Sequence, residues 1–267
     1  MQKKLILNAD DYGWDKDATQ GILQLIEAGK IHNVSILANH CSNQDFKAIQ
    51  SYSSAISCGL HVCLNEGKPL FKQTSSSIQN EEGYFYRSAE LFKKAILKKI
   101  KYADVYTEIK SQHNFLKEHG IEVTHADSHQ HIHQYPFLSK MITHALHEVG
   151  IKKIRSCTPY SIYDTRRLII SAFVFFTKQN INTFKHPDIL ITDFTNKEFV
   201  FGADVQKIIL QLNNSSYQAI EWMCHPALAD RADSYLHRTQ EYDFLRYCDW
   251  NDLLKNSSIE LSQYRFL

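Results

Sequence analysis

Asn8-Ala9-Asp10-Asp11-Tyr12-Gly13 is the stretch around which the rest of the chain is organised. It follows a short apolar run, Leu5-Ile6-Leu7, which predicts a buried strand. Two adjacent acids at the end of such a strand need partners, because an unpaired buried carboxylate costs several kcal/mol. A helix N-cap would use only one of the two side chains. The pair therefore predicts a site that attracts cations.

Composition and charge exclude several classes of protein. The chain has 267 residues, of which 43% are hydrophobic, and 30 basic residues balance 29 acidic ones. This length suits a single domain, such as an α/β barrel of roughly 250 residues. The balanced charge lacks the basic field of a nucleic-acid-binding protein, so we expect no nucleic-acid partner.

The cysteines and the apolar runs bear on the compartment. The six cysteines form no CxxC pair, which favours free thiols in a reducing compartment. The chain opens without a signal-peptide pattern, and its longest apolar run, Leu168–Phe176, is too short to span a bilayer. We therefore expect a cytoplasmic protein without a membrane span.

Short β-rich runs alternate with longer helical patterns, which predicts a parallel α/β fold. The predicted strands are Lys3–Asn8, Asn33–Ala38, Ile56–Leu64, Glu122–Ala126, Lys152–Cys157, Asp188–Thr192, Gln218–Cys224 and Ile259–Tyr264. The predicted helices are 17–28, 90–119 (as two helices), 136–149, 204–212 and 242–254. We predict one domain over residues 1–267, a TIM-barrel-like (β/α) barrel, regular or distorted, with seven to eight strands.

Two segments depart from this alternation. Residues 66–88 hold Gly67, Pro69 and the serines 75–77, and predict an insertion loop that shapes the substrate site. The segment Tyr163–Gln179 is more apolar than a solvent-facing helix. A homodimer contact and a buried helix both explain it.

Ionisable residues gather at the ends of the predicted strands. They are Asp10 and Asp11, His61, the run His125-Ala126-Asp127-Ser128-His129, Arg155, Asp193 and His225. Parallel barrels and open α/β sheets keep their active sites at this edge. Taken as one site, these residues predict a metal held by one carboxylate and two imidazoles, with open positions for water and substrate.

Such a site favours metal-assisted hydrolysis of a C–N or C–O bond. A phosphoesterase would need a richer ligand set and more basic clamps. A sugar isomerase would need more acidic ligands, and a metal-free glycosidase would need two separated carboxylates. A barrel that only binds carbohydrate would lack the base or the ligands, whereas all are present here.

The motifs resemble those of the YdjC family of carbohydrate deacetylases, which includes the ChbG-type chitooligosaccharide deacetylases. The resemblance rests on Asn8-Ala9-Asp10-Asp11-Tyr12-Gly13, Gly59-Leu60-His61, Thr124-His125-Ala126-Asp127-Ser128-His129-Gln130-His131 and Cys224-His225-Pro226. It implies a TIM-barrel-like fold and removal of the acetyl group from N-acetylated amino sugars. The chain departs from the family at Ala227, where Gly is frequent, and at Gln130, where His is frequent, and both changes bear on pocket shape.

The resemblance also implies roles for individual residues. Asp11, His61 and His125 would hold one divalent ion, magnesium or zinc. Asp10 would be the general base and His225 the general acid. Asp127 would orient an imidazole or bind a sugar hydroxyl. Arg155 would either hold a polar group of the substrate or form a structural ion pair.

Overall fold

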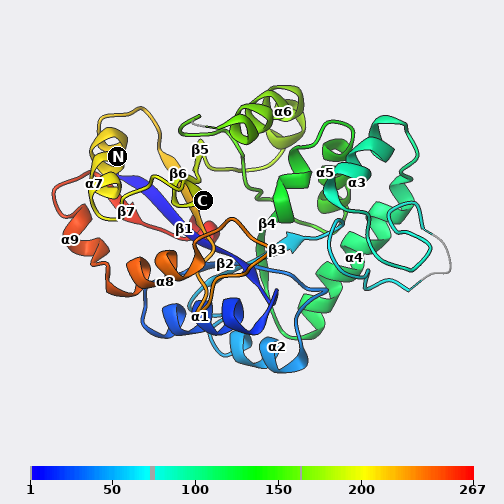
Figure 1. The fold of residues 1–267 in the computed structure, drawn as a ribbon, viewed down its shortest axis with the longest axis horizontal. Coiled ribbons are helices and arrows are strands. Elements are labelled where there is room, and N and C mark those ends of the chain that lie inside the picture. Colours follow the sequence, from blue (N-terminus) through cyan, green and yellow to red (C-terminus); the bar gives the residue numbers. More distant parts are fainter. Residues whose placement is uncertain (1, 73–75, 163) are drawn as a thin grey trace.

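A parallel β-sheet forms the centre of the molecule, with helices packed around its outside (Figure 1). The computed structural model describes residues 2–72, 76–162 and 164–267. Six strands lie in the order β4-β3-β2-β1-β6-β5, and β7 pairs with the beginning of β1. The strands are β1 (Lys3–Tyr12), β2 (Asn33–Ile36), β3 (Ser57–Val62), β4 (Val123–Ser128), β5 (Ile189–Ile191), β6 (Ala219–Cys224) and β7 (Ile259–Leu261).

Helices connect the strands and cover them. They are α1 (Lys16–Glu27), α2 (Asn43–Gln50), α3 (Ser88–Ile96), α4 (Tyr102–Glu118), α5 (Leu138–Glu148), α6 (Thr165–Ile181), α7 (Ala203–Asn213), α8 (Arg238–Tyr247) and α9 (Trp250–Leu254). Short 3-10 turns follow β4 (η1, His129–Gln134), β5 (η2, Asp193–Thr195) and β7 (η3, Tyr264–Phe266). In the view of Figure 1, α1 and α2 lie on one side of the strands and α6 on the opposite side.

The sheet is a half-barrel, so the predicted full barrel of seven to eight strands is not confirmed. The predicted strand Lys152–Cys157 is wrong. This segment makes only isolated bridges, from Ile154 to Ala126 and from Lys153 to Lys185, and Pro159 bridges to Leu190. Its backbone groups alternate between two neighbours and form no continuous ladder with either, because Ile154 donates to Lys185 while Arg155 donates to Ala126.

The predicted helices form, with shifted ends and two differences. Residues 90–119 do form two helices, α3 and α4, and residues 242–254 fall within two more, α8 and α9. The sequence prediction missed α2, which begins at a capping box between Ser42 and Asp45.

The apolar segment 163–179 mostly forms α6; Tyr163 lies outside the described residues. Phe175 and Phe176 of this helix are 78% and 70% exposed, so the buried-helix explanation is wrong. Every helix in residues 2–72, 76–162 and 164–267 is too short or too polar to cross a bilayer.

The predicted loop 66–88 contains no strand or helix before Ser88, where α3 begins, among its described residues. Residues 73–75, which include the first of the three serines, lie outside the described part of the chain. Glu66 and Arg87, at the two ends of the loop, line the large cavity described below.

A close contact between β3 and β4 explains the glycine before His61. A Cβ atom at Gly59 would lie 2.3 Å from Nε2 of His125, which is fully buried on the neighbouring strand. The His125 ring cannot withdraw, because it is stacked on the Tyr264 ring with 3.7 Å between centroids. Only glycine allows β3 and β4 to approach with this ring between them.

We therefore expect Gly59→Ala to destabilise the fold by roughly 1–3 kcal/mol, the usual cost of overpacking a core. In a His125→Ala background the same substitution should cost less than half as much, because the ring it strikes is gone. Urea unfolding of the four proteins in this cycle measures both costs. Equal costs in the two backgrounds would contradict the steric explanation.

Candidate active site

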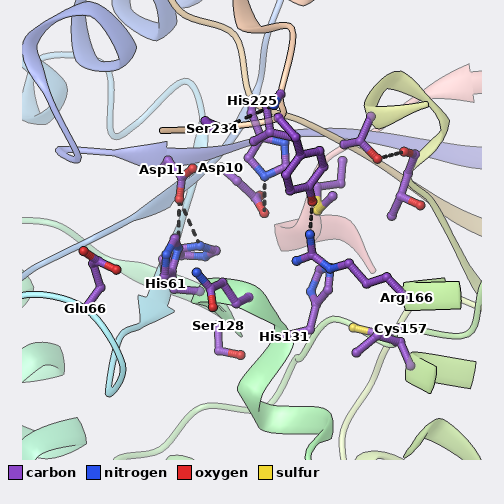
Figure 2. Close-up of a pocket in the computed structure, with 18 of the residues that line it drawn as sticks. Asp10, Asp11, His61, Glu66, Ser128, His131, Cys157, Arg166, His225 and Ser234 are labelled. Atoms are coloured by element: carbon purple, nitrogen blue, oxygen red, sulfur yellow. Dashed lines mark hydrogen bonds and ion pairs between the residues drawn. The ribbon is translucent and has the colours of Figure 1, made fainter. Parts of the chain in front are cut away.

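A cavity of about 430 Å³ opens at the carboxyl ends of the strands. Its walls include Asp10 and Asp11 from β1, His61 from β3, His129 from η1 and His225 from the loop after β6. Figure 2 shows the side chains of Asp10, Asp11, His61 and His225 converging on one space. This is the edge of a parallel sheet at which α/β proteins place their active sites.

The backbone of β1 brings both aspartates into this cavity. Adjacent side chains of a regular strand point to opposite faces. The pairing of β1 with β2 shifts in register between Ala9 and Tyr12, and Asp11 has a φ of +69°. Aspartate tolerates this left-handed conformation better than most residues. Because of the irregularity, both carboxylates line the same cavity.

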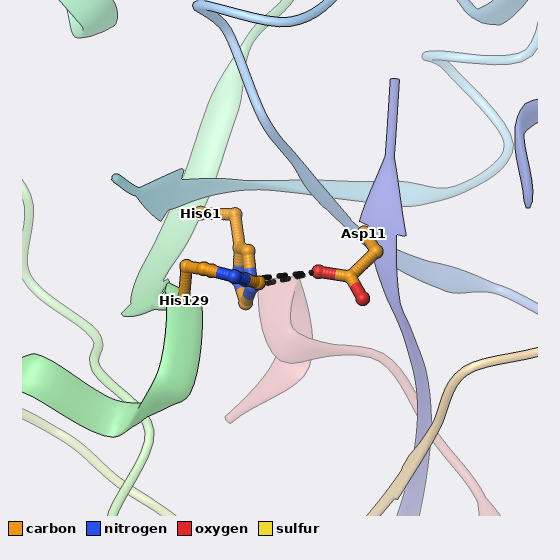
Figure 3. Close-up of side chains that lie close together, drawn as sticks. All are labelled: Asp11, His61 and His129. Carbon is orange, nitrogen blue, oxygen red and sulfur yellow. Dashed lines mark hydrogen bonds and ion pairs between the residues drawn. The ribbon is translucent and has the colours of Figure 1, made fainter. Parts of the chain in front are cut away.

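Asp11, His61 and His129 form a group that could hold a metal ion (Figure 3). Oδ1 of Asp11 lies 3.5 Å from Nε2 of His61 and 3.2 Å from Nδ1 of His129. All three side chains are buried, and Nε2 of His129 has no hydrogen-bond partner in the described part of the chain. One carboxylate and two imidazoles directed at a common position form a ligand set that binds zinc and other divalent ions.

The electrostatics of this group also fit a cation. Burial opposes the ionisation of Asp11, but Arg238, His129 and His61 hold the pKa of its carboxyl well below the usual range. Burial likewise opposes protonation of His61, yet Asp127 and Asp11 outweigh it and raise the pKa of this imidazole to about 10. The carboxylates of Asp127 and Asp11 thus favour a positive charge at His61, and a bound divalent ion would supply such a charge.

Asp127 orients His61, and Arg155 binds both Asp127 and Asp10. Oδ1 of Asp127 lies 2.7 Å from Nδ1 of His61, which leaves Nε2 of that ring facing Asp11. Such carboxylate–histidine pairs fix the ring of a metal ligand. Arg155 is fully buried and contacts Asp10, Asp127 and Glu221 at 2.6–2.8 Å. It therefore forms an internal ion-pair network and has no exposed surface for substrate.

A second group with metal-ligand spacing consists of Asp10, His61 and Asp127. Arg155 binds both of these carboxylates. Arg238 binds only Oδ2 of Asp11, and Oδ1 faces the two imidazoles, so the group around Asp11 is the better candidate for a metal.

The structure does not bring His125 to Asp11 and His61; His129 lies there instead. His125 sits within β4, where Nδ1 contacts the Thr124 hydroxyl at 2.9 Å and the ring stacks on Tyr264. Burial lowers the pKa of His125 to about 3, so the ring is neutral. The predicted strand ended at residue 126, two residues early, which placed His125 at the edge. The true strand ends at Ser128, and the residue after it is His129.

Asp10 and His225 face each other on the other side of the cavity. The guanidinium of Arg155 holds Asp10 with two bonds of 2.6 and 2.7 Å. Oδ2 of Asp10 also lies 4.0 Å from Nε2 of His225. Burial lowers the pKa of His225 to about 4 despite the nearby aspartates, so the imidazole is neutral at pH 7 and able to accept a proton.

Sequence reasoning missed two residues of α8 that complete the site. Nη2 of Arg238 contacts Oδ2 of Asp11 at 2.6 Å, and the same guanidinium lies over the ring of Trp14. Glu241 accepts a hydrogen bond from the backbone N–H of His225. Neither residue follows a strand, and so the search of strand ends could not find them. Asp193 lies in η2, where Ser161 donates to it, and it is absent from the cavity wall.

The buried carboxyl of Glu241 should make the stability of the protein depend on pH. Burial raises its pKa to about 8, although the His225 N–H and Arg238 oppose the rise. Between the unfolded pKa near 4.5 and pH 8 the folded chain binds more protons than the unfolded chain, so stability falls as pH rises. The stabilisation that protonated Glu241 contributes is complete below the unfolded pKa and is lost as the pH rises through about 8.

We expect Glu241→Gln to remove this dependence. Between pH 5 and pH 8, the wild-type free energy of unfolding should fall by a few kcal/mol more than that of the variant. Chemical unfolding at several pH values measures the difference. Parallel pH profiles for the two proteins would show that Glu241 does not carry it.

Comparisons with known proteins agree with the fold and with the motifs. Residues 4–256 match the family described as YdjC-like protein. A carbohydrate deacetylase of Clostridium beijerinckii is 23% identical over 98% of this chain and 99% of its own length. A chitooligosaccharide deacetylase of Serratia marcescens is 29% identical over 53% of this chain and 55% of its own.

A solved structure from Enterococcus faecalis V583, described as a cellobiose-phosphate cleavage protein, has the same fold. It aligns with a TM-score of 0.81 and 21% identity over 100% of this chain and 99% of that one. Because the family match covers nearly the whole chain, the protein belongs to the YdjC-like family.

Proposed function

We propose that the protein is a metal-dependent hydrolase that removes the acetyl group from N-acetylated amino sugars of the chitooligosaccharide or N-acetylglucosamine type. The observation that carries the proposal is one cavity with a carboxylate–imidazole group, Asp11 with His61 and His129, beside an acid–base pair, Asp10 with His225. The names of the relatives, carbohydrate deacetylase and chitooligosaccharide deacetylase, support the reaction and the substrate class.

Asp11, His61 and His129 would hold the divalent ion. When bound, such an ion supplies Lewis-acid chemistry, which polarises a carbonyl and lowers the pKa of water. Magnesium and zinc are the ions we propose. Asp127 keeps Nδ1 of His61 engaged, so that Nε2 is the nitrogen available on this side of the ring.

Asp10 and His225 would move the proton. Oδ2 of Asp10 takes a proton from the attacking water as the new C–O bond forms. His225 is neutral, and its Nε2 lies 4.0 Å from that oxygen, a gap that one water molecule would bridge, so that His225 would receive this proton and deliver it to the leaving nitrogen as the C–N bond breaks. The products are the free amino sugar and acetic acid, which ionises to acetate in water, and both groups return to their starting protonation states.

The first test is acetate release from N-acetylglucosamine and from acetylated chitooligosaccharides. We expect Asp10→Asn and His225→Ala each to lower kcat by about 10²–10⁴, the usual contribution of a general acid or base. Asp243→Asn, an exposed acid on α8, is the matched control and should keep full activity. The absence of acetate release by the wild-type protein with added magnesium or zinc would overturn the proposed function.

A second test separates the two candidate histidine ligands. His129→Ala should weaken metal binding by on the order of 100-fold or more, whereas His125→Ala should keep the metal and lose thermal stability. Equilibrium dialysis against zinc or magnesium measures affinity, and thermal melting reports whether each variant is folded. Loss of metal in folded His125→Ala, with retention in His129→Ala, would reverse our assignment.

A further inference from the structure

A buried path of polar contacts leads from the C-terminal end of the chain to Asp10. The hydroxyl of Tyr264 donates to Oε2 of Glu221. The other oxygen of Glu221 accepts from Arg155, from Nε at 2.9 Å and from Nη2 at 2.6 Å. Arg155 in turn holds both oxygens of Asp10. Tyr264, Glu221 and Arg155 are completely buried.

Tyr264 is itself fixed at three points. Its backbone N–H donates to the side chain of Asn33 at 2.8 Å, and its carbonyl accepts from Nζ of Lys153 at 2.7 Å. Its ring lies flat on the ring of His125, at an interplanar angle of 7°. Since its backbone and ring are held by β2, by β4 and by the segment that follows α5, the hydroxyl has a defined position in the core.

The geometry of guanidinium transmits this position to Asp10. The group is planar and presents its N–H donors in a rigid fork. In Arg155 one edge of the fork binds Asp10 and the adjacent edge binds Glu221. A rotation of the Glu221 carboxylate would therefore turn the fork and change the direction of the Asp10 oxygens. The hydroxyl of Tyr264 opposes that rotation, because it binds the second Glu221 oxygen.

We propose that Tyr264 and Glu221 are positioning residues for Asp10, which fix the plane of Arg155 and so keep Oδ2 of Asp10 directed at the reacting water and at His225. The inference rests on the proposed function, in which Asp10 acts as the base. It gives the C-terminal turn η3 a role in the reaction. It also gives His125 a role: its ring supports Tyr264.

Tyr264→Phe is the direct test, because it removes the hydroxyl and keeps the ring that stacks on His125. We expect kcat for acetate release to fall about tenfold while KM changes less than twofold, because a misdirected base slows the chemical step and leaves substrate binding intact. Tyr242→Phe is the matched control, since its hydroxyl bonds to Gln24 and its ring is absent from the cavity wall. A fall in kcat no larger than that of the control would overturn the proposal.

A second measurement does not depend on turnover. In a ¹⁵N spectrum of arginine side chains, the nitrogens of Arg155 should give separate, slowly exchanging signals, because contacts with three carboxylates restrict rotation of the group. The signals are assigned by their loss in Arg155→Lys. Tyr264→Phe and Glu221→Gln should shift or broaden them, and Tyr242→Phe should not.

The two measurements separate the possible failures. Unchanged Arg155 signals in folded Tyr264→Phe would overturn the positioning role, whatever the activity. A wild-type protein that releases no acetate would overturn the proposed function, whereas the spectrum would still report whether Tyr264 and Glu221 fix Arg155. Thermal melting establishes that each variant is folded.

Discussion

The guanidinium of Arg155 is the interaction on which the rest of the site depends. It contacts Asp10, Asp127 and Glu221 in a region without solvent exposure. Burying three carboxylates without a cation would cost far more than the fold could offset, since even one unpaired buried charge destabilises a protein by about 3–5 kcal/mol. The cation is Arg155, which lies in the segment 152–159, where the half-barrel has isolated bridges in place of a regular strand. The irregular segment of the sheet thus supplies the positive charge at the centre of the site.

Arg238 binds one oxygen of Asp11, whereas Arg155 binds the other carboxylates of the site. The contacts of Arg155 involve both Asp10 and Asp127, whereas Asp11 turns away on a left-handed backbone to face His61 and His129. Asp127 connects Arg155 with the candidate metal group, because one of its oxygens binds Arg155 and the other binds His61. The adjacent aspartates therefore differ in their surroundings although they are neighbours in the chain. This difference supports the proposal that Asp11 is a metal ligand and Asp10 the base.

Much of the site could be predicted because its ionisable residues lie in short sequence motifs. Asp10, Asp11, His61 and His225 line one cavity, and each was recognisable as an ionisable residue at the end of an apolar run. His129 was within the same histidine-rich run but was assigned no role, because the family resemblance was taken to imply His125 as the ligand and the strand was predicted to end two residues too early. A strand boundary is set by how far pairing with β3 continues, and that depends on the neighbouring strand as well as on local sequence. Arg238 and Glu241 reach the site from α8, and no local pattern marks that approach.

The sequence by itself determined the parallel α/β class, most of the strands and helices, and the kinds of side chain that meet at the sheet edge. Hydrophobic periodicity and residue chemistry are local properties, so they can be read along the chain. Only the tertiary structure decided which histidine faces Asp11, which carboxylates Arg155 neutralises, and that the sheet remains a half-barrel. These outcomes depend on contacts between residues far apart in sequence, such as Tyr264 with Glu221 and Arg155 with Asp10. Burial then fixes them, because each polar group removed from water must find its partner within the fold.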